Sequence, residues 1–209
     1  MRKNKFLLIF SILVYIFLFA PLIIIGITAF GGESYIAFPP KSFSVKWFAN
    51  IFSSETFMNT LKTSMEISLI ATIAALILGV PAAYALSRFN FKGKTILKNF
   101  FFSPVIVPGI VVGFSLFQFM IIKLKLPIYT SLLIGHTIII IPYIIRVIGS
   151  SLEGFDYAIE EAAMSLGAGK VETFFKVVFP NITSGVIAAF MLAFINSFNN
   201  VPVSIFLTG

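Results

Sequence analysis

The chain has 209 residues, of which 58% are apolar and only 11% are charged, and its formal net charge is +7. Soluble globular domains carry about 25% charged residues, so this composition excludes an ordinary water-soluble domain and indicates a membrane protein. The sequence has no cysteine and one histidine, which excludes a disulfide scaffold, a cysteine nucleophile and a multi-histidine metal centre.

Five largely uncharged runs are long enough to cross a membrane, because a hydrocarbon core about 30 Å thick needs about 20 apolar residues of helix. They lie at 6–30, 58–86, 99–122, 128–145 and 181–198. The first run exceeds the apolar core of a secretory signal, so we expect a retained anchor. The pattern predicts an all-α transmembrane bundle of five crossings.

The loop at 31–56 contains Phe38-Pro39-Pro40, which favours extended backbone. Residues 44–52 then place apolar side chains at helical spacing around Trp47. This spacing predicts a short amphipathic helix that lies at the membrane surface.

The flanking cations predict how the chain is oriented, because short loops rich in Lys and Arg stay in the cytoplasm. Cations occur before the first run, between the second and third runs, and between the fourth and fifth runs. These three regions share one side of the membrane. The other side has Lys41 and Lys46 in a long loop and Lys123 and Lys125 in a short one, but the excess of cations predicts a cytoplasmic N-terminus. Because the cations alternate with hydrophobic runs, we expect no nucleic acid partner.

Two features inside the middle runs invite both a packing and a functional interpretation. Gly109 and Gly113 form a small-xxx-small pattern, which lets two helices approach closely. His136 lies deep in the fourth run, where we favour a neutral, hydrogen-bonded histidine between helices over a ligand contact.

The segment at 151–180 differs from the rest of the chain because it holds five of the eight acidic residues. Residues 158–166 favour a helix with carboxylates in its first turn, where the helix dipole stabilises negative charge. Gly167 and Gly169 end that helix, and a second short helix is expected at 171–179. The segment predicts a stiff docking projection, with a solvated connector as the alternative.

The spacing in this segment resembles a known signature. Glu161-Ala162-Ala163, Gly167 after three residues, and Val177 to Pro180 after nine more resemble the E-A-A-x-x-x-G-x9-I-x-L-P signature. That signature marks permease subunits of binding-protein-dependent ABC importers. The stretch at 197–209 further resembles the spermidine and putrescine branch, although Asn199 and Asn200 stand where that branch often has acidic residues.

The resemblance implies a type I ABC importer permease helical bundle of the MetI-like kind. It implies six crossings, so we expect a sixth beyond Gly209, and a single domain over 1–209 with a cytoplasmic coupling loop at 151–180. It implies a bacterial inner membrane location, a second permease subunit, an ATP-binding subunit, an extracytoplasmic solute-binding protein and a polyamine-like solute. ATP is used by the partner, with no cofactor or catalytic residue in this chain. The residues implied in coupling are Glu161, Ala162, Ala163, Gly167 and Pro180.

Polar residues near the membrane runs are candidates for lining the solute pathway. They are Gln118, His136, Asn196, Asn199 and Asn200. Asn196 and Asn200 share a helix face if the fifth helix continues that far.

Two other classes of protein remain open on the residues alone. A secondary transporter or channel would concentrate charged residues inside its helices, whereas this chain concentrates them in one loop. A membrane enzyme would have to use carboxylates, and none are paired at membrane depth.

Overall fold

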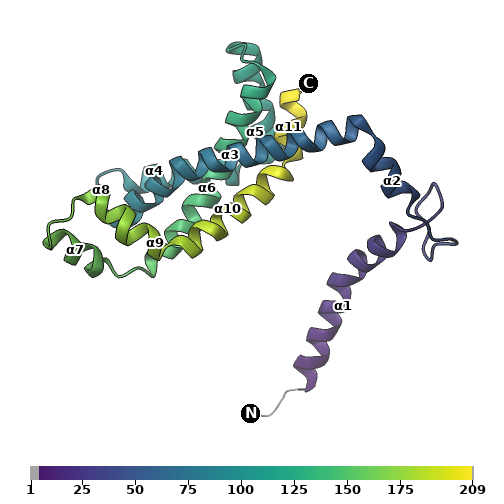
Figure 1. Ribbon diagram of the computed structural model, residues 1–209, viewed down its shortest axis with the longest axis horizontal. Helices are drawn as coiled ribbons and strands as arrows, with labels where there is room; N and C mark the ends of the chain where they lie inside the picture. Colours follow the sequence, from purple (N-terminus) through teal and green to yellow (C-terminus); the bar gives the residue numbers. More distant parts are fainter. Residues whose placement is uncertain (1–4, 209) are drawn as a thin grey trace. The chain divides into compact units, whose positions relative to one another are not determined.

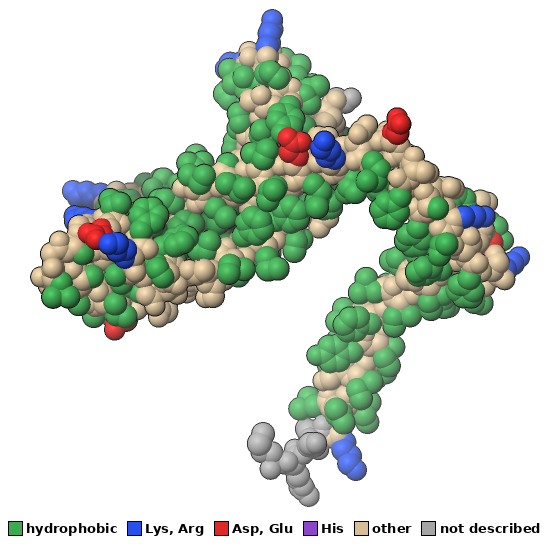
Figure 2. All heavy atoms as spheres, in the orientation of Figure 1, with side chains coloured by type: hydrophobic (Ala, Val, Ile, Leu, Met, Phe, Trp, Pro, Cys, Tyr) green, Lys and Arg blue, Asp and Glu red, His purple; other side chains and the backbone are tan. Residues whose placement is uncertain are grey.

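The computed structural model describes residues 5–208, and Arg2, Lys3 and Gly209 lie outside that range (Figure 1). The described residues are mostly helical, with one isolated antiparallel bridge between Gly31 and Phe43 and no β-strand among them. The chain forms two compact units, Met1–Lys62 and Thr63–Gly209. Figure 2 shows hydrophobic side chains covering most of the visible helical surface, as expected for a membrane protein.

The first unit begins with helix α1, Lys5–Thr28, which confirms the predicted first helix. None of its 24 residues is buried in the structure. A helix that is apolar on all sides and is not covered by the rest of its chain is expected to contact lipid or another membrane helix. α1 is therefore a membrane-crossing candidate by length and composition.

The loop after α1 folds back on itself before the short helix α2, Lys46–Ser53. The indole N–H of Trp47 donates to the carbonyl of Glu33 at 3.1 Å, and the rings of Phe30 and Phe48 lie 5.2 Å apart. The helix predicted at 44–52 is confirmed, because these contacts fix its apolar side chains against the loop. Its location at a membrane surface stays a prediction.

Helix α3, Glu55–Arg88, begins in the first unit and continues into the second. Its 34 residues span about 50 Å at 1.5 Å per residue, which exceeds a hydrocarbon core of about 30 Å. The buried residues from Ile67 to Leu86 recur at three- and four-residue spacing along one face. α3 is therefore longer than a helix needs to be to cross that layer.

The prediction of one continuous third helix is wrong. The structure divides it into α4, Lys94–Ile106, α5, Gly109–Leu116, and the π-helix η1, Phe117–Lys123. α4 is bent by 102° from the pair that follows. Pro108 causes the break, because it lacks an N–H to continue the helix and holds Val107 in extended backbone.

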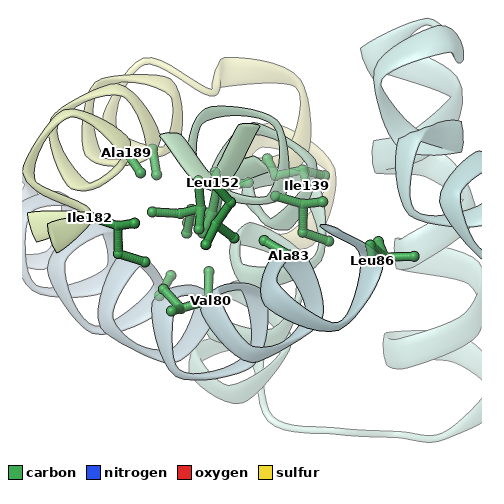
Figure 3. Packing of buried hydrophobic residues seen from close by; sticks show 14 of the residues in the cluster. Val80, Ala83, Leu86, Ile139, Leu152, Ile182 and Ala189 are labelled. Carbon is green, nitrogen blue, oxygen red and sulfur yellow. The ribbon is translucent and has the colours of Figure 1, made fainter. Parts of the chain in front are cut away.

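Helix α6, Ile128–Glu153, is the centre of the second unit. Ile140, Ile144, Ile148 and Leu152 are spaced by four residues and fully buried, so they form one continuous ridge. Figure 3 shows Leu152 in the same cluster as side chains of α3, Ile182 just before α10, and Ala189 within α10. α6 continues further than the predicted end at residue 145, because its last turns are held by this core.

Helix α10, Thr183–Phe198, packs along α6 and confirms the predicted fifth helix. A Cβ atom at Gly185 would overlap the side chain of Ser151, so glycine permits the two backbones to approach closely. A short further helix, α11, Val201–Thr208, follows and was not expected. It packs on α5 and α6.

The segment between α6 and α10 forms four short elements at one end of the second unit (Figure 1). They are α7, Tyr157–Ser165, α8, Lys170–Thr173, the π-helix η2, Phe174–Val178, and α9, Phe179–Asn181. α7 begins as predicted, because the Asp156 carboxylate accepts a hydrogen bond from the Ala158 N–H at 2.9 Å. The second predicted helix is present but is interrupted by η2.

Three helices, α1, α3 and α6, are individually long and apolar enough to cross a membrane. Two bent pairs, α4 with α5–η1 and α8–α9 with α10, raise the number to as many as five within the described residues. The predicted count of five crossings is compatible with this range and stays a prediction.

The small-xxx-small pattern on α5 is a packing site, as we favoured. A Cβ atom at Gly113 would lie 2.8 Å from the carbonyl oxygen of Pro202 and 2.9 Å from the ring of Phe206. One at Gly109 would lie 3.4 Å from Pro202. The glycines thus allow α11 to lie directly against the α5 backbone.

We expect Gly113→Ala to lower the stability of the detergent-solubilised protein by about 1–2 kcal/mol, because the new methyl group meets a backbone carbonyl. Gly149→Ala is the matched control, since Gly149 also lies within a helix and has open space around its Cβ position. Its better helix propensity should maintain or raise stability. Thermal unfolding measures both, and equal shifts would contradict the close contact.

Candidate functional site

The end of α3 is tied to α7 by a cluster of four side chains, which we call the Arg88 clamp: Tyr84, Arg88, Glu160 and Glu161. The Tyr84 hydroxyl donates to Glu160 Oε1 at 2.6 Å. Arg88 Nη2 donates to Glu161 Oε1 at 2.7 Å, and Arg88 Nε lies 3.4 Å from Glu160 Oε2. One guanidinium therefore holds two adjacent carboxylates.

Aromatic contacts support the clamp. The Arg88 guanidinium lies 4.9 Å from the centre of the Tyr157 ring, whose hydroxyl donates to Ser87 Oγ at 2.9 Å. The Tyr84 ring meets Phe174 edge to face at 5.0 Å. Residues 69 to 90 positions apart in the sequence are thus held together, so the end of α3 is joined to α7 and η2.

Glu160 is the buried member of the clamp, with 5% of its surface exposed. It borders a cavity of about 490 Å³ that is otherwise lined mainly by apolar side chains, including Pro81, Phe89 and Phe174. A carboxylate in such surroundings is tolerated only when a cation and hydrogen-bond donors compensate its charge. Arg88 and Tyr84 supply that compensation.

The predicted coupling residues lie on the outer side of this cluster. Glu161 leaves 61% of its side chain exposed even though it is paired with Arg88. Ala162 is exposed, Ala163 is half-buried, and Pro180 is exposed at the start of α9. The structure therefore places the first three on one short helix, whereas Pro180 belongs to the connection into α10.

α7 is followed by Gly167, which has a backbone conformation that only glycine adopts readily. Its φ angle is +97°, its N–H donates to Met164 O at 3.0 Å, and the Ala168 N–H donates to Ala163 O at 3.2 Å. These bonds satisfy the last carbonyls of α7. Leu166, next to it, is 90% exposed, so the turn presents an apolar side chain at its tip.

Four residues of this site were not among the predicted coupling residues: Tyr84, Arg88, Glu160 and Leu166. The adjacent carboxylates Glu160 and Glu161 were one available signal, because a nearby cation favours their charged forms. The periodic pattern could not indicate that this cation lies at the end of α3.

A separate ion pair lies on the exposed face of the same loop. Lys176 Nζ donates to Glu172 Oε1 at 2.7 Å across one helical turn. This hydrogen bond lowers the pKa of Glu172. Both side chains are at least half exposed, so the pair contributes little to stability.

Two of the predicted pathway residues line one cavity. Asn196 and Asn200 border a space of about 180 Å³ together with Tyr143. α10 ends at Phe198, before Asn200, yet Asn200 still faces the cavity because its Oδ1 accepts the Val203 N–H at 3.1 Å and so caps α11. The structure therefore brings these two asparagines together without a continuous helix.

The other three predicted pathway residues lie elsewhere. His136 is 3% exposed, with Nδ1 2.9 Å from Ser197 Oγ and Nε2 3.2 Å from Ser204 Oγ. This geometry agrees with a hydrogen-bonded histidine that joins α6, α10 and α11. Gln118 on η1 and Asn199 at the end of α10 are exposed, and neither borders the cavity of Asn196.

The fold and the loop can be compared with known proteins. Residues 75–209 match the family described as the binding-protein-dependent transport system inner membrane component. The chain belongs to this family. It is therefore a multi-pass inner membrane component of an ABC transport system, and not an enzyme. The family prediction and the all-α permease fold are confirmed.

Individual relatives are similar over nearly the whole chain. The chain is 33% identical to the spermidine/putrescine transport system permease protein PotC of Haemophilus influenzae, over 96% of this chain and 77% of that protein. It is 28% identical to the putrescine transport system permease protein PotI of Escherichia coli, over 99% and 76%.

A solved structure shows the same fold. The crystal structure of a bacterial ABC transporter involved in import of the acidic polysaccharide alginate matches with a TM-score of 0.70, over 94% of this chain and 72% of that chain, at 19% identity. The helical arrangement of a permease subunit is therefore present. The secondary transporter considered above is not supported, because the family is one of ABC permeases.

We expect Arg88→Gln to loosen α7, because Glu160 would keep its buried charge and lose its cation. The cost is about 3 kcal/mol. Hydrogen–deuterium exchange of residues 157–166 should become faster. Lys176→Gln is the control, since it removes an exposed pair and should leave that exchange unchanged.

The double variant Arg88→Gln with Glu160→Gln should recover most of the protection, because no buried charge remains. Equal exchange in Arg88→Gln and Lys176→Gln would show that the clamp does not hold α7.

Proposed function

We propose that this chain is the permease subunit of an ATP-driven importer and that residues 151–180 couple it to an ATP-binding subunit. The observation that carries this proposal is the exposed turn at Leu166 and Gly167, which is braced against α3 by the Arg88 clamp. A second permease subunit completes the solute pathway, and an extracytoplasmic solute-binding protein delivers the solute.

The surface of α7 supports docking of a protein partner. Leu166 is 90% exposed and Ile159 is 48% exposed, although both lie in the most acidic segment of the chain. Exposed apolar side chains bordered by charges are typical of protein interfaces. Glu161 of the same helix has 61% of its side chain exposed although it is paired with Arg88, so its side chain can still be reached by a partner.

The clamp supplies the mechanical connection to the membrane. Because Arg88 and Tyr84 both lie in the last turns of α3, a displacement of α7 acts directly on a membrane-crossing helix. Closure of the ATP-binding subunits on ATP would move α7 as a rigid body, and the helices would change between inward-open and outward-open arrangements. ATP is consumed by the partner, and this chain needs no cofactor.

The distribution of cations supports an orientation with the coupling loop and the N-terminus in the cytoplasm. Arg88 ends α3 and is paired with Glu161 of α7, and the chain then continues through Lys92 into α4, which begins at Lys94. This distribution supports a location of the loop on the side of the membrane where ATP is present.

The names of the relatives support a polyamine-like solute as the first candidate. Asn199 and Asn200 are uncharged, which removes two carboxylates that a cation could use. The solute-binding protein is expected to select the solute before it reaches the membrane.

Gly167→Pro should uncouple ATP hydrolysis from uptake in the assembled transporter, while the membrane helices still insert. Proline cannot adopt the φ angle of +97° at this position. Gly169→Pro is the matched control, because Gly169 has a φ angle of −70°, which proline adopts. Uptake and ATPase activity of reconstituted complexes measure the effect. Normal coupling in Gly167→Pro would contradict the proposed role.

A cross-linking experiment tests the partner directly. Leu166→Cys introduces a unique thiol, because the chain has no cysteine. A short bifunctional reagent should join it to the ATP-binding subunit in membranes that contain the whole complex. Gln118→Cys, also exposed but on η1, should not react with that subunit. If Leu166→Cys, like the control, failed to cross-link while the complex remained intact, the coupling role would be rejected.

A further inference from the structure

The cavity beside Glu160 is formed by one face of each of three helical segments. Pro81, Tyr84 and Arg88 line it from α3 at spacings of three and four residues. Glu160 and Met164 line it from α7, four residues apart, and α8 with η2 supplies the third side. Residues at these spacings share a helix face, so the cavity lies between packed helices.

Most of the lining is apolar and open to the surroundings of the protein. Phe89, Val171 and Phe175 all line the cavity and are exposed, and Val171 has 72% of its surface accessible. Clustered apolar side chains on a surface mark a site that binds an apolar partner. The cavity is therefore suited to an apolar chain.

The cavity lies at one boundary of the apolar layer. Pro81 belongs to the apolar run that ends at residue 86, whereas Arg88 lies just beyond it. The two residues are seven positions apart on α3, or about 10 Å, which covers the headgroup region and the first part of the acyl chains. A cytoplasmic protein would have to enter the apolar layer to reach Pro81. A lipid is already present there.

Cations surround the polar part of the cavity. Arg88 is shared by two carboxylates, but Lys170 lines the cavity, is exposed and forms no ion pair with any residue in 5–208. Lys92 follows Phe89 by three residues, so their Cα atoms lie within about 11 Å of each other. Cations next to a membrane-crossing helix attract anionic lipids.

Glu160 adds a second requirement, because only one of its carboxylate oxygens accepts a hydrogen bond. Oε1 accepts from Tyr84, whereas Oε2 has no hydrogen-bond donor among the described residues, although Arg88 Nε lies 3.4 Å away. A buried oxygen without a donor is costly. A headgroup with a hydroxyl group can supply that donor.

We propose that this cavity binds one anionic phospholipid, phosphatidylglycerol, from the cytoplasmic leaflet. Its acyl chain lies along Phe89, Val171 and Phe175. Lys170 binds its phosphate, and a hydroxyl group of its headgroup donates to Glu160 Oε2. The site goes beyond the proposed transport function, and only the choice of leaflet rests on the proposed orientation. Because the lipid contacts the same carboxylate as Arg88, it stabilises the contact between α7 and α3.

Photolabelling tests the site in the assembled transporter, with its partner permease and ATP-binding subunits, in nanodiscs of phosphatidylcholine. The probe is a trace of phosphatidylglycerol with a diazirine on one acyl chain, and mass spectrometry identifies the labelled peptides. We expect labels within 81–89 and 170–175 that excess phosphatidylglycerol suppresses and added phosphatidylcholine does not. Equal suppression by both lipids would indicate bulk lipid only and would overturn the proposal.

Two pairs of variants test the residues. Lys170→Gln should lower the labelling about fivefold, because it removes one cation at the membrane surface. Lys176→Gln removes the same charge outside the cavity and should have no effect. Val171→Asp should abolish the labelling by placing a charge along the acyl chain, whereas Leu166→Asp, also exposed but outside the cavity, should not. Unchanged labelling in Lys170→Gln or in Val171→Asp would contradict the site.

Competition by a second lipid tests the hydroxyl group. Phosphatidylmethanol has the charge of phosphatidylglycerol but no donor in its headgroup, so it should compete severalfold more weakly. Equal competition would overturn the contact with Glu160. Labelling that is lost whenever the ATP-binding subunit is present would identify that subunit as the occupant and reject the lipid. Cross-linking at Leu166 is the separate reference, because it fails if the coupling proposal is wrong, whereas the lipid labelling does not.

Discussion

The buried carboxylate of Glu160 is the constraint on which the functional part of this structure depends. A charge with 5% exposure must be compensated, and the compensation comes from Arg88 and Tyr84 at the end of a helix 34 residues long. Because the two partners belong to different elements, α7 cannot move independently of α3. A local electrostatic requirement thereby becomes a connection between a loop and the membrane.

A second requirement organises the membrane part. In lipid the hydrophobic effect does not drive helices together, so they must pack closely to associate. Glycines permit this close packing at the points where the helices contact one another. Gly185 faces Ser151, Gly113 faces Pro202, and Gly79 faces Ile144 across three different helix pairs. α6 is central because it receives two of these contacts, at Ser151 and at Ile144. The remaining polar groups, such as His136, are then satisfied by partners on neighbouring helices.

These two requirements separate the functions of the second unit. The clamp and the exposed turn lie at one end, where charge and apolar surface suit docking of a protein. The Asn196 cavity lies along α6 and α10, where asparagine side chains border open space. α6 joins both regions, since it leads directly into the coupling loop.

The sequence by itself determined the class of the protein, the position of most helices and the coupling motif, because these depend on composition, periodicity and fixed spacing. It also indicated the glycine turn at 167. The tertiary structure decided what depends on distant residues: the break at Pro108, the pairing of Arg88 with Glu160, the partners of His136, and the separation of Gln118 and Asn199 from the cavity. A carboxylate does not reveal in sequence which of fifteen cations will approach it, because the packing of the helices sets that distance.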